Sequence, residues 1–161
     1  MKFGNLHELF IGELKDIYDA EHQITKALPK MKKAASSSDL QKAFDEHLKE
    51  TETHIKRLEK VFDMIEEEAE RETCDAMEGL ISEGEEIIEE NKKSDARDAA
   101  LIAAAQRVEH YEIAGYGTLR TYAQLLDYPE AAELLQQTLD EEGEADKKLT
   151  GLAEAINPEA V

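Results

Sequence analysis

The chain has 161 residues and a formal net charge of −19, because 38 acidic side chains outnumber 19 basic ones. A surface this acidic repels phosphate groups, which argues against nucleic-acid binding and against docking on anionic membranes. Hydrophobic residues make up 41% of the chain, enough for the core of one domain of ordinary size. We therefore expect a single domain over residues 1–161. Good helix formers dominate it and alternating strand patterns are missing from the sequence, so the expected class is all-α.

Four long helices and one short helix are predicted along the chain. The first stops before Pro29, because proline lacks the amide hydrogen that a helix interior uses. The serine-rich stretch at residues 36–39 predicts a turn and an N-cap for the second. A long crossover with a short amphipathic helix follows the second. The long helices are expected at residues 5–28, 40–69, 95–126 and 129–156, and the short helix at residues 75–91.

The lengths of the predicted connections indicate how the helices pair. The loops inside the first and the second pair of long helices are short, whereas the link between the pairs is long. Two antiparallel hairpins joined by one long crossover form a ferritin-like four-helix bundle. A faint repeat, DAEHQI around Glu21 and RVEHYEI around Glu109, supports two related hairpins.

Cysteine content and apolar runs indicate the compartment. The one cysteine, Cys74, excludes an intrachain disulfide and favours a reducing environment. The N-terminal segment has no apolar stretch typical of a signal peptide, and the longest apolar run, residues 99–105, is too short to span a bilayer. A cytoplasmic protein is expected.

Acidic residues interrupt the core-facing stripes of three long helices near their midpoints. Glu21 takes an apolar position in the first helix, and Glu112 does so in the third, with Glu109 about 60° from the stripe centre at 100° per residue. In the last helix two successive inner positions, Glu142 and Asp146, are acidic. One such residue is commonly a long side chain that reaches solvent, but three interruptions at one level favour a buried cluster.

The second long helix is less regular. Thr51 occupies the middle of its apolar stripe, while His47, Glu50 and His54 share one flank. A modest rotation of the helix would turn that flank inward. The pattern leaves open whether His47 and His54 are metal ligands or ordinary surface residues.

Carboxylates buried together stay charged only when cations compensate them. Ferritin-like di-iron proteins place two metals among one Glu from each of two helices and a Glu-x-x-His pair from each of the others. Asp146, at i+4 from Glu142, departs from that pattern. The oxygen-rich set favours two divalent ions, iron first and manganese second, over zinc or copper. The predicted metal ligands are Glu21, His47, Glu50, His54, Glu109, Glu112, Glu142 and Asp146.

Several segments resemble a known family along nearly the whole chain. CDAMEGL in the crossover, RDAALIAAAQRVEHYEIAGYGTL and TLDEEGEADKKL in the last two helices, and HLKET in the second are similar to the YciF/YciE-like stress-response proteins. The resemblance implies a ferritin-like bundle, a homodimer and a dinuclear metal site similar to that of rubrerythrin. It favours His47, in HLKET, over His54, which lies outside the shared motif. By motif it implies ligands at Glu21, His47, Glu50, Glu109, Glu112, Glu142 and Asp146.

Three functions remain open at this point. The first is a di-iron or di-manganese oxidoreductase that acts on hydrogen peroxide, dioxygen or ferrous iron and protects against oxidative stress. The second is a non-catalytic metal-binding or structural stress protein that acts through a partner. The third is an interaction bundle with a metal-free polar core. The sequence has no rubredoxin-like cysteine pairs, so electrons would come from a partner or from the substrate.

Overall fold

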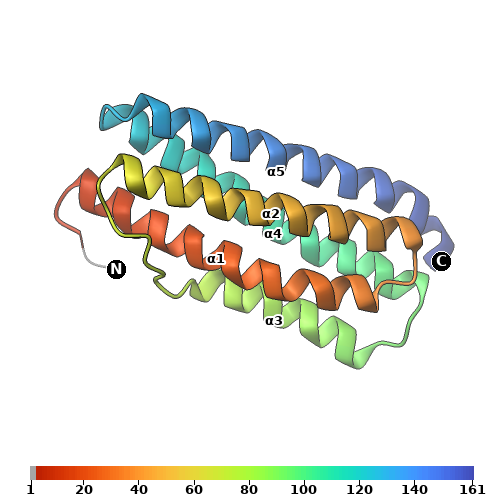
Figure 1. Ribbon diagram of the computed structural model, residues 1–161. Coiled ribbons are helices and arrows are strands. Elements are labelled where there is room, and N and C mark those ends of the chain that lie inside the picture. The colour runs from red at the N-terminus through yellow and green to blue at the C-terminus, as the bar shows by residue number, and fades with distance from the viewer. Residues whose placement is uncertain (1–2) are drawn as a thin grey trace.

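The computed structural model describes residues 3–161, and in that range the chain is helical with no strand. Figure 1 shows the long helices α1, α2, α4 and α5 side by side, with α3 along the outside of the bundle. The predicted all-α, ferritin-like four-helix bundle with an extra crossover helix is confirmed. The helices are α1 (Leu6–Ala34), α2 (Ser38–Met64), α3 (Asp75–Glu90), α4 (Asp95–Leu125) and α5 (Pro129–Ile156), followed by the 3-10 helix η1 (Asn157–Ala160).

Two helix ends differ from the sequence prediction. The expected stop at Leu28 is wrong, because α1 continues through Pro29 to Ala34. Proline removes one backbone hydrogen bond there, but Leu28 and Ala34 are buried against the bundle and hold the last turns in place. The expected end near residue 69 is also wrong, because α2 ends at Met64. Glu66 has a φ of 58°, a left-handed conformation that no right-handed helix continues.

The core is apolar towards both ends of the bundle and polar at its middle. Each Leu or Phe buried at the two ends contributes roughly 1.5–3 kcal/mol to folding. These ends hold the polar middle in a fixed arrangement and separate it from water. The largest contributors, all at most 2% exposed, include Phe10, Leu14, Leu40, Phe44, Leu58, Phe62, Leu101, Leu119 and Leu135.

A buried carboxylate fixes the second hairpin against the first. Asp98, in the first turn of α4, accepts hydrogen bonds from the backbone N–H groups of Ser36, at 2.8 Å, and Ser37, at 2.7 Å. Its neighbour Arg97 donates to the carbonyl oxygen of Ala34. The loop between α1 and α2 is thereby tied to the start of α4, which sets the level at which the hairpins meet.

Within residues 3–161, none of the helices combines the length and the apolar character that crossing a lipid bilayer requires.

Candidate metal centre

Six ionisable side chains converge at the middle of the bundle, in two overlapping groups. Within each group, one ligand atom from every residue lies within 4.8 Å of all the others. The first group consists of His47, Glu109, Glu112 and Glu142. The second consists of Glu21, His54 and Glu142. Because Glu142 belongs to both, the groups form two adjacent positions that share one carboxylate.

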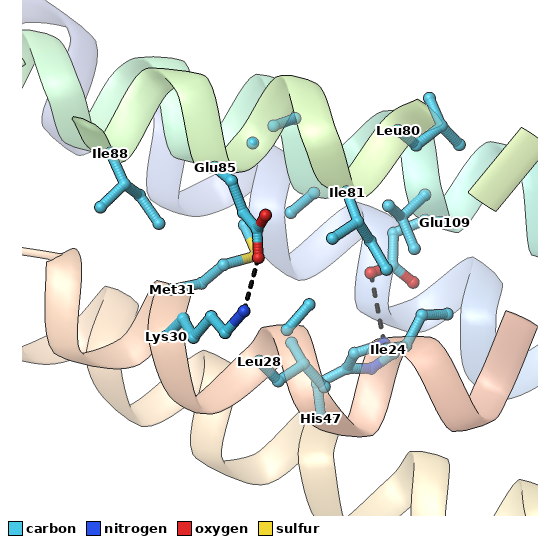
Figure 2. A pocket seen from close by; sticks show the side chains of 15 residues that line it. Ile24, Leu28, Lys30, Met31, His47, Leu80, Ile81, Glu85, Ile88 and Glu109 are labelled. Carbon is cyan, nitrogen blue, oxygen red and sulfur yellow. Dashed lines mark hydrogen bonds and ion pairs between the residues drawn. The ribbon is translucent and has the colours of Figure 1, made fainter. Parts of the chain in front are cut away.

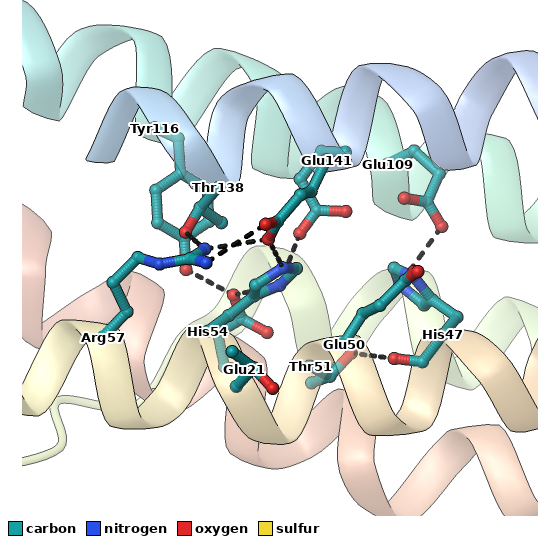
Figure 3. Close-up of polar contacts among 12 residues, drawn as sticks. Glu21, His47, Glu50, Thr51, His54, Arg57, Glu109, Tyr116, Thr138 and Glu141 are labelled. Atoms are coloured by element: carbon teal, nitrogen blue, oxygen red, sulfur yellow. Dashed lines mark hydrogen bonds and ion pairs between the residues drawn. The ribbon is translucent and has the colours of Figure 1, made fainter. Parts of the chain in front are cut away.

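Each side chain occupies an inward position of its helix. Glu21 comes from α1 and Glu142 from α5, while α2 and α4 supply two residues each. His47 and His54 are two turns apart on α2 and therefore share a face. Between them, the Thr51 hydroxyl donates to the carbonyl oxygen of His47 at 2.9 Å, and both imidazole rings point into the bundle (Figure 3).

Most polar atoms of this centre have no hydrogen-bond partner among the described residues, although all six side chains are buried. A buried polar atom without a partner costs about 1–3 kcal/mol. A protein layer evolved only for packing would not accumulate such atoms at one place. The donor set, carboxylate oxygen and imidazole nitrogen, fits divalent metal ions. The atoms without a hydrogen bond are Oε2 of Glu21 and Glu109, both oxygens of Glu112 and Glu142, both ring nitrogens of His47 and Nδ1 of His54.

The four glutamates strongly perturb one another. Burial raises the pKa of Glu112 well above its ordinary value, and three neighbouring carboxylates add to the shift. Burial likewise raises the pKa of Glu109 and of Glu21, against the opposing effect of the nearest histidine. Burial also acts to raise the pKa of Glu142, but the contact with His54 and the charges of both histidines together lower it.

For the two histidines, burial and the neighbouring carboxylates act on the pKa in opposite directions, and the carboxylates dominate. Burial acts to lower the pKa of His47, but Glu109, Glu50 and the other carboxylates together raise it to about 9. Burial opposes the shift of His54 in the same way, and Glu142 and Glu21 raise its pKa to about 10. Without metal, the centre therefore holds protons on the side-chain atoms that would bind a metal ion.

An outer carboxylate orients His54. Its Nε2 lies 2.8 Å from Oε2 of Glu141, while its Nδ1 faces the centre, 2.9 Å from Glu142 and 3.5 Å from Glu21. Arg57 holds Glu141 through two hydrogen bonds, at 2.8 and 3.1 Å, and also donates to Thr138 (Figure 3). An Nε2–H donated to Glu141 leaves the Nδ1 lone pair free for a metal, the usual arrangement behind a ligating histidine.

His47 has a similar but looser arrangement. Its Nε2 lies 3.4 Å from Oε1 of Glu109 inside the centre (Figures 2 and 3), and its Nδ1 lies 3.6 Å from Oε2 of Glu50. The Glu50 side chain is 51% exposed. The structure thus places Glu50, a predicted ligand, outside both groups, as an outer neighbour of His47.

Asp146 also lies outside both groups. It accepts a hydrogen bond from Gln106 at 3.0 Å, and its Oδ1 lies 3.4 Å from Nε2 of the exposed His110. The other six predicted ligands meet at the centre, including both histidines that the sequence left undecided. Sequence reasoning did not single out the partners of these ligands, Glu141 and Arg57, because both are partly exposed and interrupt no apolar stripe.

Tyr116 completes the centre at the α1 side. Its ring is fully buried and its hydroxyl donates to Oε1 of Glu21 (Figure 3). The hydrogen bond fixes one oxygen of Glu21 and leaves the other, Oε2, without a partner among residues 3–161.

The composition of the centre equals that of ferritin-like di-iron sites, but its distribution differs. The general pattern supplies four glutamates and two histidines, with each histidine three residues after a glutamate on the same helix. Here α2 supplies both histidines and no glutamate to the two groups, while α4 supplies Glu109 and Glu112. The set of donors is therefore the same as in the general pattern, but the helices that supply them differ.

Glu141 offers a direct test of the outer arrangement. In Glu141→Ala, His54 loses the partner that orients its ring, so metal affinity should fall by about 10- to 100-fold. Calorimetric titration with Mn²⁺ measures the change. Glu144→Ala, an exposed position on the same helix, is the matched control and should bind as the parent does. Equal affinities in the two variants would show that Glu141 does not support a ligand.

Comparisons with known proteins agree with this fold. Residues 5–161 match the family described as a domain of unknown function (DUF892). The chain is 50% identical over 157 residues to Protein YciF of Escherichia coli (strain K12), covering 95% of this chain and 93% of the relative. It is similar to the crystal structure of the E. coli stress protein YciF, with a TM-score of 0.94 and 48% identity over 97% of this chain and 99% of that one.

More distant structures share the same architecture. YcfI from Rhodopseudomonas palustris has a TM-score of 0.89 at 42% identity, over 91% of this chain and 94% of that one. A protein from Xanthomonas campestris pv. campestris has a TM-score of 0.77 at 19% identity, over 94% of this chain and 93% of that one, which shows a common fold alone.

Proposed function

The chain belongs to the family described as a domain of unknown function (DUF892). From the site itself we propose that it is a dinuclear metal protein whose centre reacts with a small oxidant. One observation carries the proposal. Four buried glutamates and two buried histidines present atoms without hydrogen bonds to two adjacent positions. Two divalent ions would balance four ionised glutamates while both histidines bind as neutral donors.

The six residues would bind the two metal ions in two sets that share one glutamate. His47 and the two glutamates of α4 would hold one ion, Glu21 and His54 the other, and Glu142 would reach both. Oxygen donors outnumber nitrogen donors, which favours iron, with manganese as the alternative. Two ferrous ions held there would supply the two electrons that, with two protons, reduce one hydrogen peroxide to two water molecules, or one dioxygen to one hydrogen peroxide.

A second candidate function is supported by the burial of the ligands. All six are at most 7% exposed, so bound metal would be shielded and would stabilise the bundle without turnover. In that case the protein would act under stress through a partner. The homodimer and the cytoplasmic location expected from the sequence also remain predictions, and sedimentation equilibrium would test the first.

Anaerobic titration with ferrous iron tests the proposal. We expect about two tightly bound ions per chain and a rise in melting temperature, because metal binds only the folded centre. Addition of hydrogen peroxide to the loaded protein should then change its optical spectrum. Two bound ions without a reaction would favour the second candidate. Absence of tight binding for both iron and manganese would refute the metal proposal altogether.

A further inference from the structure

A small cavity lies under α3, between that helix and the bundle. Its volume is about 30 Å³, and α1, α3 and α4 enclose it (Figure 2). A space of this size admits one or two molecules as small as water. Its walls are largely aliphatic. The side chains that set this character include Ile24, Leu28, Met31, Ile81, Ile88 and Val108.

The two ends of the cavity differ. Lys30 and Glu85, whose side chains are 61% and 43% exposed, form an ion pair of 2.6 Å between α1 and α3 at the rim (Figure 2). His47 and Glu109, both buried, line the cavity on the opposite side, where their contact belongs to the metal centre. The cavity is therefore lined at one end by the Lys30–Glu85 pair near the surface and at the other by two residues of the centre.

The cavity under α3 lies beside a glycine, which has no side chain to fill it. Gly84 lines the cavity and is buried, yet a Cβ added there would meet no atom within 4 Å. Glycine is less favourable than alanine inside a helix. A larger residue would cover the cavity and would also suit the helix better, so the absence of a side chain is not explained by packing.

We propose that this cavity is the entry and holding site for dioxygen at the His47–Glu109 end of the metal centre, an inference that rests on the proposed function. Dioxygen forms no strong hydrogen bonds with water and loses none on entering an aliphatic space. Hydrogen peroxide would leave its hydrogen bonds behind and find few in return. Dry apolar cavities bind small apolar molecules such as xenon for the same reason.

A second cavity reaches the same end of the centre and differs from the cavity under α3. It also has a volume of about 30 Å³ and also touches His47 and Glu109, but it is lined from α2 and α5 as well as α1 and α4, and Glu50 and Lys148 lie among its mostly apolar lining residues. Glu50 lies 3.6 Å from Nδ1 of His47 and offers hydrogen bonds to a polar oxidant beside the centre, whereas Lys30 and Glu85 at the rim of the first cavity pair with each other. Blocking the cavity under α3 should therefore slow the reaction with dioxygen and spare the reaction with hydrogen peroxide.

Dioxygen itself is the probe in the first experiment, which uses metal-free protein. Under dioxygen pressure, the methyl groups of Ile24, Ile81 and Val108 should show paramagnetic relaxation in NMR well above that of Leu14, a buried residue that does not line the cavity. In Gly84→Leu the excess should fall by roughly tenfold, as expected when a binding space is filled. Gly84→Ala, a smaller change, should give an intermediate loss.

Gly79→Leu is the matched control, because Gly79 lies on the same helix, is exposed and does not line the cavity. It should leave the relaxation unchanged. Cavity methyl groups that relax no faster than Leu14, or a Gly84→Leu variant that behaves like the control, would overturn the proposal.

The second experiment uses iron-loaded protein. Gly84→Leu should bind the same amount of iron as the parent and react about tenfold more slowly with dioxygen, with its peroxide reaction unchanged. An equal slowing of both reactions would overturn the assignment to dioxygen. If the parent protein binds no metal, the proposed function fails, whereas the metal-free NMR experiment still decides whether the cavity takes up dioxygen.

Discussion

Glu142→Ala is expected to reduce tight metal binding from two ions per chain to one at most. Glu142 is the carboxylate that both groups share, so its removal takes a ligand from each position. The second group would keep only Glu21 and His54, too few for tight binding, while the first would keep His47, Glu109 and Glu112. Elemental analysis after anaerobic loading and desalting measures the stoichiometry.

The exposed neighbour Glu144 again serves as the control for this substitution, since Glu144→Ala removes a carboxylate from α5 without touching the centre. That variant should still hold two ions. If Glu142→Ala also retains two, the shared carboxylate has been assigned to the wrong residue and the arrangement of the two positions must be different.

Glu112→Met is expected to stabilise the metal-free protein by about 1–3 kcal/mol, although it removes a carboxylate from the centre. Glu112 is fully buried, neither of its oxygens has a partner in the described part of the chain, and burial raises its pKa well above the ordinary value. Methionine has a similar length, and its flexible apolar chain adapts to irregular spaces. Urea unfolding without metal measures the gain.

With metal present, the order of stabilities should reverse. Metal in thousandfold excess over its dissociation constant adds about 4 kcal/mol per site to the parent protein, and the variant loses part of that gain. Glu112→Gln, which removes the charge but keeps the polarity, should show a smaller gain without metal. A metal-free Glu112→Met protein that is less stable than the parent would indicate that Glu112 belongs to a structural polar layer.

Helix periodicity and the lengths of the connections predicted the fold, and periodicity marked the glutamates of the centre. Glu21, Glu112 and Glu142 each replace an apolar residue in a stripe, and a helix whose inward position carries a glutamate must bury it. Glu109, about 60° from its stripe centre at 100° per residue, still reaches the centre because a glutamate side chain is long.

Helix geometry also bears on the predicted ligands that the sequence left open or assigned wrongly. His54 follows His47 by seven residues and so points within about 20° of it. Glu50 is offset by about 60° towards the solvent-facing side of α2, where its side chain is 51% exposed. The structure accordingly brings the two histidines together and places Glu50 outside. Asp146 lies a full turn beyond Glu142, where α5 faces Gln106 and His110 of α4. Single-helix patterns cannot show which neighbouring helix a position faces.

The features that the sequence did not predict depend on contacts between helices. The arrangement of His54, Glu141 and Arg57 joins α2 to α5, and no spacing within either helix marks it. The continuation of α1 through Pro29 likewise depends on packing of the following turn against the bundle, which outweighs the local preference of proline to end a helix.

The placement of the shared carboxylate has a consequence for how the protein is made. Ribosomal synthesis delivers the helices from the N-terminus onward, and α1 and α2 emerge with Glu21, His47 and His54 long before α5 exists. Neither group is complete without Glu142, which lies in that last long helix. The nascent hairpin therefore lacks a complete ligand set, and the centre could take up metal ions only after the whole chain has folded.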